Sequence, residues 1–193
     1  GRAVCYDVYR LELKRNRLLK MADVAPEGGR RNVPFLDLKA INESFEPELS
    51  NSMLRAVQSG WYLFGEENRL FEQEWSRYVG TANAVLCANG LDALTLILRA
   101  YRTLRGWQDG DEVIVPANTY IASILAIREA GLKPVLVEPS MCDYNIRAKE
   151  CQKALTDKTR AIMVVHLYGR VCCDIGNITA LAKENNLVVV EDA

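Results

Sequence analysis

From residue 84 onward, short runs of consecutive apolar residues alternate with segments of helical periodicity. Runs that are apolar throughout, without polar residues at alternate positions, are typical of strands that helices bury on both faces. Five such runs separated by helical segments predict an α/β fold with a mostly parallel, helix-covered sheet. The expected strands are residues 84–87, 113–115, 135–137, 161–165 and 187–190.

Helices are expected where apolar residues recur three or four positions apart. In the alternating region these segments are residues 91–104, 120–130, 148–155 and 178–185. Earlier in the chain, similar patterns predict helices at residues 11–21, 48–59 and 68–79. Ligands of such folds bind beyond the carboxyl ends of the strands, so we expect a site in the loops that follow the strands.

Length and composition fit an ordinary globular chain. Of its 193 residues, 49% are hydrophobic and 25% are charged, which excludes collagen-like, low-complexity and fully disordered proteins. No apolar run reaches the roughly 18 residues of a membrane-spanning helix, and the first residues lack the apolar core of a signal peptide. We therefore expect a cytoplasmic protein with no membrane partner.

Charge and turn residues divide the chain near residue 32. Residues 1–31 hold eight Lys/Arg and four Asp/Glu, whereas the remainder holds sixteen and twenty-one. A segment rich in Pro and Gly at residues 25–32 marks the boundary. We interpret residues 1–32 as a basic N-terminal extension outside the domain. No basic patch with interleaved aromatic residues follows it, so a nucleic-acid partner is not expected.

The cysteines and histidine give no metal site. None of the six cysteines forms a C-x-x-C pair, and His166 is the only histidine. Irregular spacing in an α/β pattern favours buried, reduced thiols over disulfides. The cysteines are Cys5, Cys87, Cys142, Cys151, Cys172 and Cys173.

The turn after the first expected strand has the features of an anion site. Asn89 is a good helix N-cap, and Gly90 lets a ligand approach the backbone closely. Exposed amides and the positive end of the helix dipole would attract a phosphate. A tight turn without a ligand is the alternative, and the Asp92 charge would oppose a phosphate nearby.

Three further residues stand where other expected strands end. Tyr120 can stack on a planar ligand or simply plug the top of the sheet. His166 can transfer protons, although a lone histidine is more often a structural hydrogen-bonding residue. Asp192 can hold a heteroaromatic nitrogen protonated, the alternative being a solvated acid at a strand end.

Several motifs along the chain, taken in order, resemble the DegT/StrS family of nucleotide-sugar aminotransferases, over residues 33–193. These enzymes use pyridoxal 5′-phosphate (PLP) and have the aspartate-aminotransferase fold. One of these motifs has the sequence Asn-Gly-Leu-Asp-Ala-Leu at residues 89–94, and in this form it resembles the subgroup that aminates C3 of dTDP-3-keto-6-deoxyhexoses. The motifs are Val33–Leu38, Ser59–Gly65, Ala88–Leu94, Gly110–Tyr120, His166–Gly169 and Glu191–Ala193.

The resemblance implies cofactor-binding roles for matched residues only. The turn of Gly90, Leu91 and Asp92 would hold the cofactor phosphate. Tyr120 would stack on the pyridine ring, and Asp192 would pair with the pyridinium nitrogen, which makes the ring an electron sink.

A substrate role is implied for one more segment, and an activity for the whole protein. Trp61 and Tyr62 would line the mouth of the active site, with plain core as the alternative. The implied reaction is transamination of a dTDP-linked keto-deoxy sugar, with glutamate as donor, in deoxyamino-sugar and cell-surface polysaccharide biosynthesis. A homodimer is expected at full length. The alternatives are a PLP sugar dehydratase of the same family or a truncated, non-catalytic domain that binds a ligand or partner.

No catalytic residue is assigned within this chain. The family's lysine, which forms the internal aldimine, is expected downstream of Ala193, and no lysine after residue 32 stands in its context. Residues 33–193 are therefore expected to be the N-terminal portion of the PLP-binding large domain, inactive alone. Arg147, where an acid is usual, and the Cys172-Cys173 pair depart from the family pattern.

Overall fold

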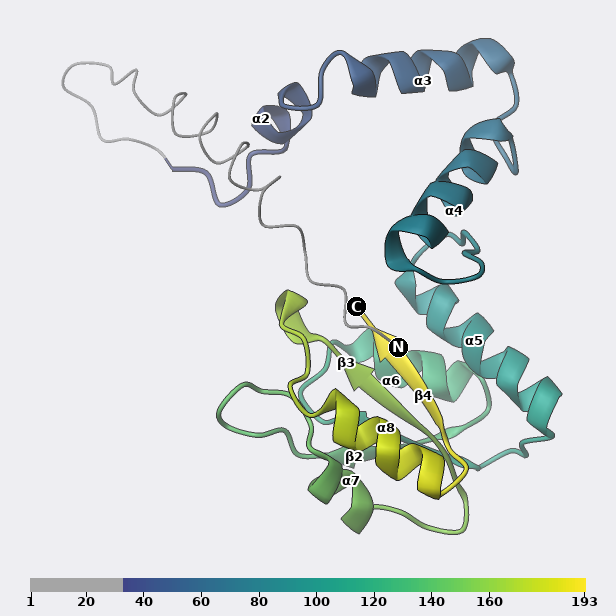
Figure 1. Ribbon diagram of the computed structural model, residues 1–193, viewed down its shortest axis with the longest axis vertical. Helices are drawn as coiled ribbons and strands as arrows, with labels where there is room; N and C mark the ends of the chain where they lie inside the picture. The colour runs from purple at the N-terminus through teal and green to yellow at the C-terminus, as the bar shows by residue number, and fades with distance from the viewer. Residues whose placement is uncertain (1–32) are drawn as a thin grey trace. The chain divides into compact units, whose positions relative to one another are not determined.

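The computed structural model describes residues 33–193 (Figure 1). The predicted basic extension and the predicted helix at residues 11–21 lie outside the described residues. The chain divides into two compact units, residues 1–86 and residues 87–193, which are considered separately.

The N-terminal unit contains three described helices: α2 (Leu38–Glu43), α3 (Glu48–Ser59) and α4 (Glu66–Val79). Helix α3 has the predicted bounds, and α4 begins two residues earlier than predicted. Helix α2 was missed because its six residues are too few to show a period; the Asp37 side chain caps it by accepting the Ala40 N–H at 2.9 Å. None of these three helices buries a side chain.

The C-terminal unit is built on a parallel sheet, as predicted. Its strands are β1 (Glu112–Pro116), β2 (Lys133–Val137), β3 (Thr159–Val165) and β4 (Val188–Asp192), in the order β2-β1-β3-β4. Four of the five predicted strands are therefore confirmed.

The predicted strand at residues 84–87 is wrong. An extended segment becomes a strand only when a neighbouring strand satisfies its backbone groups. Here the Leu86 N–H donates to the Glu72 carboxylate at 2.8 Å, and Val85 is 84% exposed. An apolar run alone could not show that this segment has no strand partner among the described residues.

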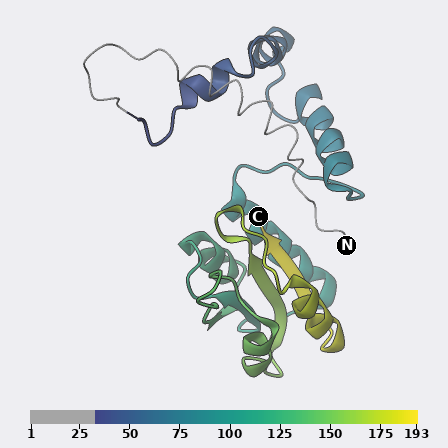
Figure 2. The same ribbon diagram turned by 60° about the vertical axis from the view of Figure 1, so that its left-hand side comes forward.

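Helices cover both faces of the sheet, as Figures 1 and 2 show. Four helices were predicted in this part of the chain, and each observed helix begins and ends within three residues of its predicted bounds. Helices α5 and α6 pack on one face, and α7 and α8 pack on the other. They are α5 (Gly90–Arg105), α6 (Ile121–Glu129), α7 (Ala148–Lys153) and α8 (Ile175–Glu184).

The sheet has a hydrophobic core on each face, and successive side chains of the central strands enter the two cores in turn. Val113 and Val115 of β1 belong to the cluster under α5 and α6, whereas Ile114 belongs to the cluster under α7 and α8. Successive side chains of a strand point to opposite faces, so a strand between two helical layers must be apolar at every position. All three residues are fully buried, which is why the run shows no polar alternation.

The amino edge of the sheet is held by a buried carboxylate. Glu112, at the start of β1, accepts hydrogen bonds from Thr156 Oγ1 at 2.5 Å and Lys133 Nζ at 3.0 Å. Thr156 precedes β3 and Lys133 begins β2, so one side chain links three neighbouring segments. The hydrogen bond from Thr156, and then that from Lys133, hold the pKa of Glu112 below its ordinary value.

The five described cysteines are free thiols. Cys151 and Cys172 are buried as predicted, and burial raises the pKa of the Cys151 thiol to about 12. The prediction of burial is wrong for the other three, which are exposed because they lie in loops: Cys87, Cys142 and Cys173.

Candidate functional site

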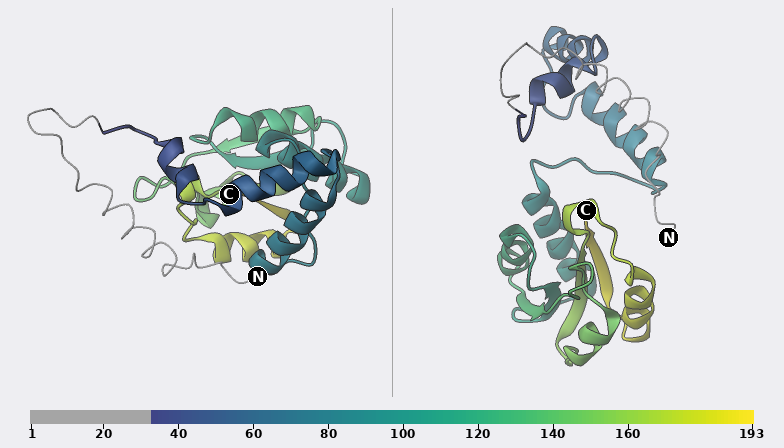
Figure 3. Two further views of the ribbon diagram at one scale, coloured as in Figure 1. Left: turned by 90° about the horizontal axis from the view of Figure 1, so that it is seen from above. Right: turned by 90° about the vertical axis from the view of Figure 1, so that its left-hand side faces the viewer.

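Helix α5 directs its N-terminus toward the carboxyl edge of the sheet. Its C-terminal end lies at the opposite, amino edge, because Arg105 Nη1 is bonded to Asn186 Oδ1 at 3.3 Å, just before β4 begins. The helix has 16 residues, so its first residue lies on the order of 24 Å away along its axis. Figure 3 shows α5 running beside the sheet in this sense. The Gly90 turn therefore lies at the same end of the unit as the strand ends.

The first turn of α5 offers free backbone donors. Asn89 Oδ1 accepts the Asp92 N–H at 2.9 Å, and the Ala93 N–H bonds to the Asn89 carbonyl at 3.0 Å. Among residues 33–193 no acceptor bonds the amides of Gly90 and Leu91. Two unpaired amides at the positive end of a long helix can bind a phosphate oxygen.

The Asp92 carboxylate has a hydrogen-bond donor within this turn. Asn89 Nδ2 donates to Asp92 Oδ2 at 3.0 Å, so the two side chains bond each other reciprocally. The predicted phosphate turn therefore has free donors, and its one acid has a polar partner.

Tyr120 stands at the N-cap of α6 with its side chain 77% exposed. It does not plug the sheet, which leaves its ring free to contact a ligand. Two hydrogen bonds fix the loop that precedes it: the Ala117 N–H donates to the Val137 carbonyl at 2.9 Å, and Asn118 Nδ2 donates to the Tyr144 carbonyl at 3.0 Å.

Asp192 ends β4 and is held by residues that the sequence did not single out for a role. Its Oδ2 accepts the Ser123 hydroxyl at 2.7 Å, and Ser123 Oγ lies 2.8 Å from Thr119 Oγ1. This contact joins the start of α6 to the end of β4, so Tyr120 and Asp192 lie on adjoining elements. Ser123 was missed, although it is a polar residue in the otherwise apolar stretch 121–127.

His166 is a structural hydrogen-bonding residue in this arrangement. Its Nδ1 accepts the Cys172 N–H at 3.1 Å, so the proton of the neutral ring is on Nε2, which lies 2.8 Å from Glu191 Oε2. Both ring nitrogens are thus occupied within the protein. The ring links the loop after β3 to the end of β4.

Trp61 and Tyr62 lie in the turn between α3 and α4 of the N-terminal unit, 70% and 63% exposed. Neither side chain is buried within its own unit. Their place at an active-site mouth stays a prediction.

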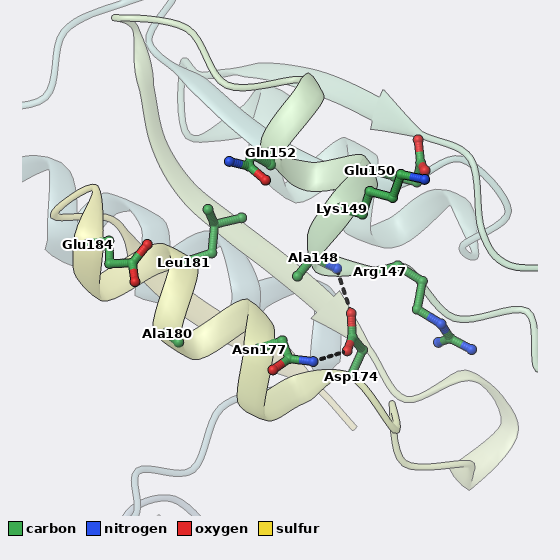
Figure 4. Close-up of a pocket in the computed structure, with 10 residues that line it drawn as sticks. All are labelled: Arg147, Ala148, Lys149, Glu150, Gln152, Asp174, Asn177, Ala180, Leu181 and Glu184. Carbon is green, nitrogen blue, oxygen red and sulfur yellow. Dashed lines mark hydrogen bonds between the residues drawn. The ribbon is translucent and has the colours of Figure 1, made fainter.

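A surface hollow of about 600 Å³ lies between α7 and α8 (Figure 4). In its wall, Asp174 accepts the Ala148 N–H at 2.7 Å and an amide hydrogen of Asn177 at 2.6 Å. One carboxylate oxygen therefore joins the start of α8 to α7, and the other bonds within the first turn of α8. The hollow contains none of the predicted site residues, and it separates two covering helices.

The groups at the carboxyl edge of the sheet fit PLP. The free amides of Gly90 and Leu91 match a phosphate, the exposed ring of Tyr120 matches a flat ring, and the Asp192 carboxylate matches a protonated ring nitrogen. Within the described part of the chain, no group of three or more His, Cys, Asp or Glu side chains could hold a metal ion. Nor does any helix there have the length and apolarity to cross a membrane.

Two curated relatives share about half of the aligned residues. The chain is 51% identical over 160 residues to a dTDP-3-amino-3,6-dideoxy-alpha-D-galactopyranose transaminase of Aneurinibacillus thermoaerophilus, covering 83% of this chain and 43% of the relative. It is 44% identical over 161 residues to a dTDP-3-amino-3,4,6-trideoxy-alpha-D-glucose transaminase of Streptomyces venezuelae, covering 83% and 41%. The chain thus spans less than half the length of these relatives.

Solved structures show the same fold. DesV of Streptomyces venezuelae superposes with a TM-score of 0.78 at 43% identity, over 85% of this chain and 43% of that one. NtdA of Bacillus subtilis, solved with bound cofactor PMP, gives 0.76 at 28% identity, over 88% and 38%. The sequence profile of the DegT/DnrJ/EryC1/StrS aminotransferase family matches residues 43–193. The chain belongs to this aminotransferase family, as its motifs predicted.

Proposed function

We propose that the full-length protein uses PLP to transfer an amino group, with glutamate as donor, to a dTDP-linked keto-deoxy sugar. One observation carries this proposal. A helix turn with two free backbone amides, an exposed aromatic ring and a hydrogen-bonded carboxylate lie at one edge of the sheet, in a chain 51% identical to a transaminase named for a dTDP-amino sugar.

Each residue has a defined task in this proposal. The amides of Gly90 and Leu91 bind the cofactor phosphate, and Tyr120 supports one face of the ring. Asp192 keeps a proton on the ring nitrogen. PLP, when bound, supplies an electron sink for the carbon that loses its proton.

The lysine of the family is assigned outside residues 33–193. No lysine lies in the loops that follow β1, β2 and β3, which are residues 117–120, 138–147 and 166–174. Lys133 begins β2 at the opposite edge, where it bonds Glu112. We infer that residues 33–193 are the N-terminal portion of the PLP-binding large domain and that the complete protein forms a homodimer.

The test is to add PLP and then L-glutamate to the full-length protein while recording its absorption spectrum. We expect a new visible band with PLP and its loss with glutamate. Asp192→Ala is expected to weaken both changes, and Glu150→Gln, on the far helix α7, to leave them intact. A protein whose spectrum does not respond to PLP would contradict the proposal.

Product analysis separates the alternatives. With a dTDP-keto-deoxy sugar and glutamate, transamination yields a sugar product that has gained nitrogen. A dehydratase would yield a product that has lost oxygen without gaining nitrogen, and a non-catalytic domain would yield no product. Mass spectrometry of the nucleotide sugar distinguishes the three outcomes.

A further inference from the structure

Three polar side chains join the loop after β1, the first turn of α6 and the end of β4. Thr119 Oγ1 lies 2.8 Å from Ser123 Oγ, which donates to Asp192 Oδ2 at 2.7 Å. Ser123 is 1% exposed, so bulk water does not compete for its hydroxyl. A charge-assisted bond in such surroundings is stronger than one at the surface.

The direction of these hydrogen bonds is determined. A carboxylate only accepts, and a serine hydroxyl has one proton to give. The Ser123 proton therefore goes to Asp192, and Thr119 must donate to Ser123. Each hydroxyl proton has a single position.

This arrangement divides the two oxygens of Asp192 between two tasks. Oδ2 is anchored by Ser123, whereas Oδ1 has no hydrogen-bond partner among the described residues. The side chain is held in one orientation, with one oxygen left for a ligand.

We propose that Ser123 and Thr119 are positioning residues that orient the Asp192 carboxylate toward the ring nitrogen of PLP. The inference rests on the proposed function, because it takes Asp192 as the partner of that nitrogen. Tyr120 lies between Thr119 and Ser123 in the chain. Residues 119–123 thus supply both the surface for the ring and the anchor for the carboxylate that meets it.

The experiment follows the ring nitrogen itself. Pyridoxamine phosphate labelled with 15N in its ring is added to the full-length protein, and its nitrogen chemical shift is recorded against pH. This compound forms no covalent bond with a lysine, so the titration reports only the contacts of the ring. Affinity is measured on the same samples.

The Ser123→Ala variant is expected to bind pyridoxamine phosphate about tenfold more weakly, because it loses one hydrogen bond to a charged group. The ring nitrogen should also lose its proton at a lower pH than in the wild type, because a mobile carboxylate stabilises the pyridinium less. Thr119→Val should change both quantities in the same direction by less. Ser123→Thr, which keeps the hydroxyl, should restore them.

Thr95→Val is the matched control, because Thr95 Oγ1 is buried and has no hydrogen-bond partner in the described part of the chain. It should leave the titration and the affinity unchanged. Asp192→Asn should leave the ring nitrogen unprotonated over most of the range.

A folded Ser123→Ala variant with wild-type titration and affinity would overturn the proposal, provided that Asp192→Asn still changes both. If Asp192→Asn also has no effect, Asp192 is not the partner of the nitrogen, and the proposed function loses its support. If Ser123→Ala does not fold, Thr119→Val decides. A wild-type titration in that variant would overturn the proposal that the two hydroxyl residues orient Asp192.

Discussion

Ser123 and Thr95 are both buried hydroxyl residues, yet of the two only Ser123 has a hydrogen-bond partner among residues 33–193. The difference lies in what each side chain faces. Ser123 bonds a carboxylate from another element, whereas Thr95 lies within α5 and no described residue bonds its oxygen. Burying an unpaired hydroxyl costs free energy, because its bonds to water are lost without replacement.

Thr95→Val is therefore expected to stabilise the protein. Valine has nearly the same shape and removes the unpaired oxygen, so the free energy of unfolding should rise by about 1 kcal/mol. Urea denaturation followed by circular dichroism measures the change. Thr103→Val, which removes an exposed hydroxyl bonded to the Arg99 carbonyl, serves as control and should change stability little. A less stable Thr95→Val protein would show that the hydroxyl has a partner in solution.

At the scale of elements, Asn89 has two roles at the start of α5. Asn89 supplies both functions through different atoms: Oδ1 caps the helix, and Nδ2 bonds Asp92. The two functions can be separated by substitution, since aspartate caps as well as asparagine but has no donor.

Asn89→Ala should lower the free energy of unfolding by about 1 kcal/mol, the usual cost of losing an N-cap. Asn89→Asp keeps the cap but replaces the donor to Asp92 with a second carboxylate, so it should lose less stability than Asn89→Ala only if the cap outweighs the repulsion between the two carboxylates. It should bind pyridoxamine phosphate about tenfold more weakly, because two adjacent carboxylates then face the phosphate. Denaturation and equilibrium titration measure the two effects. Equal affinities of Asn89→Asp and the wild type would argue against phosphate binding at this turn.

The amino edge of the sheet gives a pH-dependent prediction. The pKa of Glu112 is lower in the folded protein than its ordinary 4.5, so its ionised form contributes stability above that value. This contribution is lost as the pH falls through the folded-state pKa. Glu112→Gln should therefore be less stable than the wild type near neutrality, and the difference should shrink progressively below about pH 4.5.

Unfolding measured across this pH range checks the result. Glu150→Gln is the control, since Glu150 also bonds a lysine, Lys153, but in an exposed pair. Exposed pairs contribute little to stability, so its difference from the wild type should stay small throughout. A pH-independent difference for Glu112→Gln would mean that the lost charge is not the cause.

At the scale of the whole molecule, the two units differ in how much they bury. Strands β1 and β3 lie between other strands and two helical layers, whereas α2, α3 and α4 bury no side chain. Three aromatic side chains of α4 pack against one another but stay about half exposed: Phe71, Trp75 and Tyr78.

Amide hydrogen exchange of the 193-residue chain should reflect this difference. We expect the amides of β1 and β3 to exchange slowest, and those of α3 and α4 to exchange many times faster, because few buried contacts oppose their opening. Mass spectrometry of peptides from each unit measures the rates. Protection of α4 equal to that of β1 would mean that another surface covers its aromatic face in solution.

The local pattern of the sequence determined most of the fold. Strands β1 and β3 were predictable because both of their faces are buried, and helix α3 because its apolar residues repeat and Gly60 ends it. The family was predictable from motifs in register. Both kinds of signal lie within a few neighbouring residues, which is why the sequence alone contains them.

Only the tertiary structure decided the relations between distant segments. Val85 has the apolar neighbours of a strand, but pairing depends on whether another strand meets it, and none of the described strands does. Ser123 and Asp192 lie 69 positions apart, so no local pattern could join them. Both ring nitrogens of His166 are hydrogen-bonded, one to the Cys172 N–H and one to the Glu191 carboxylate. A hydrogen bond between elements exists only once packing has brought its two atoms together, and packing is a property of the whole chain.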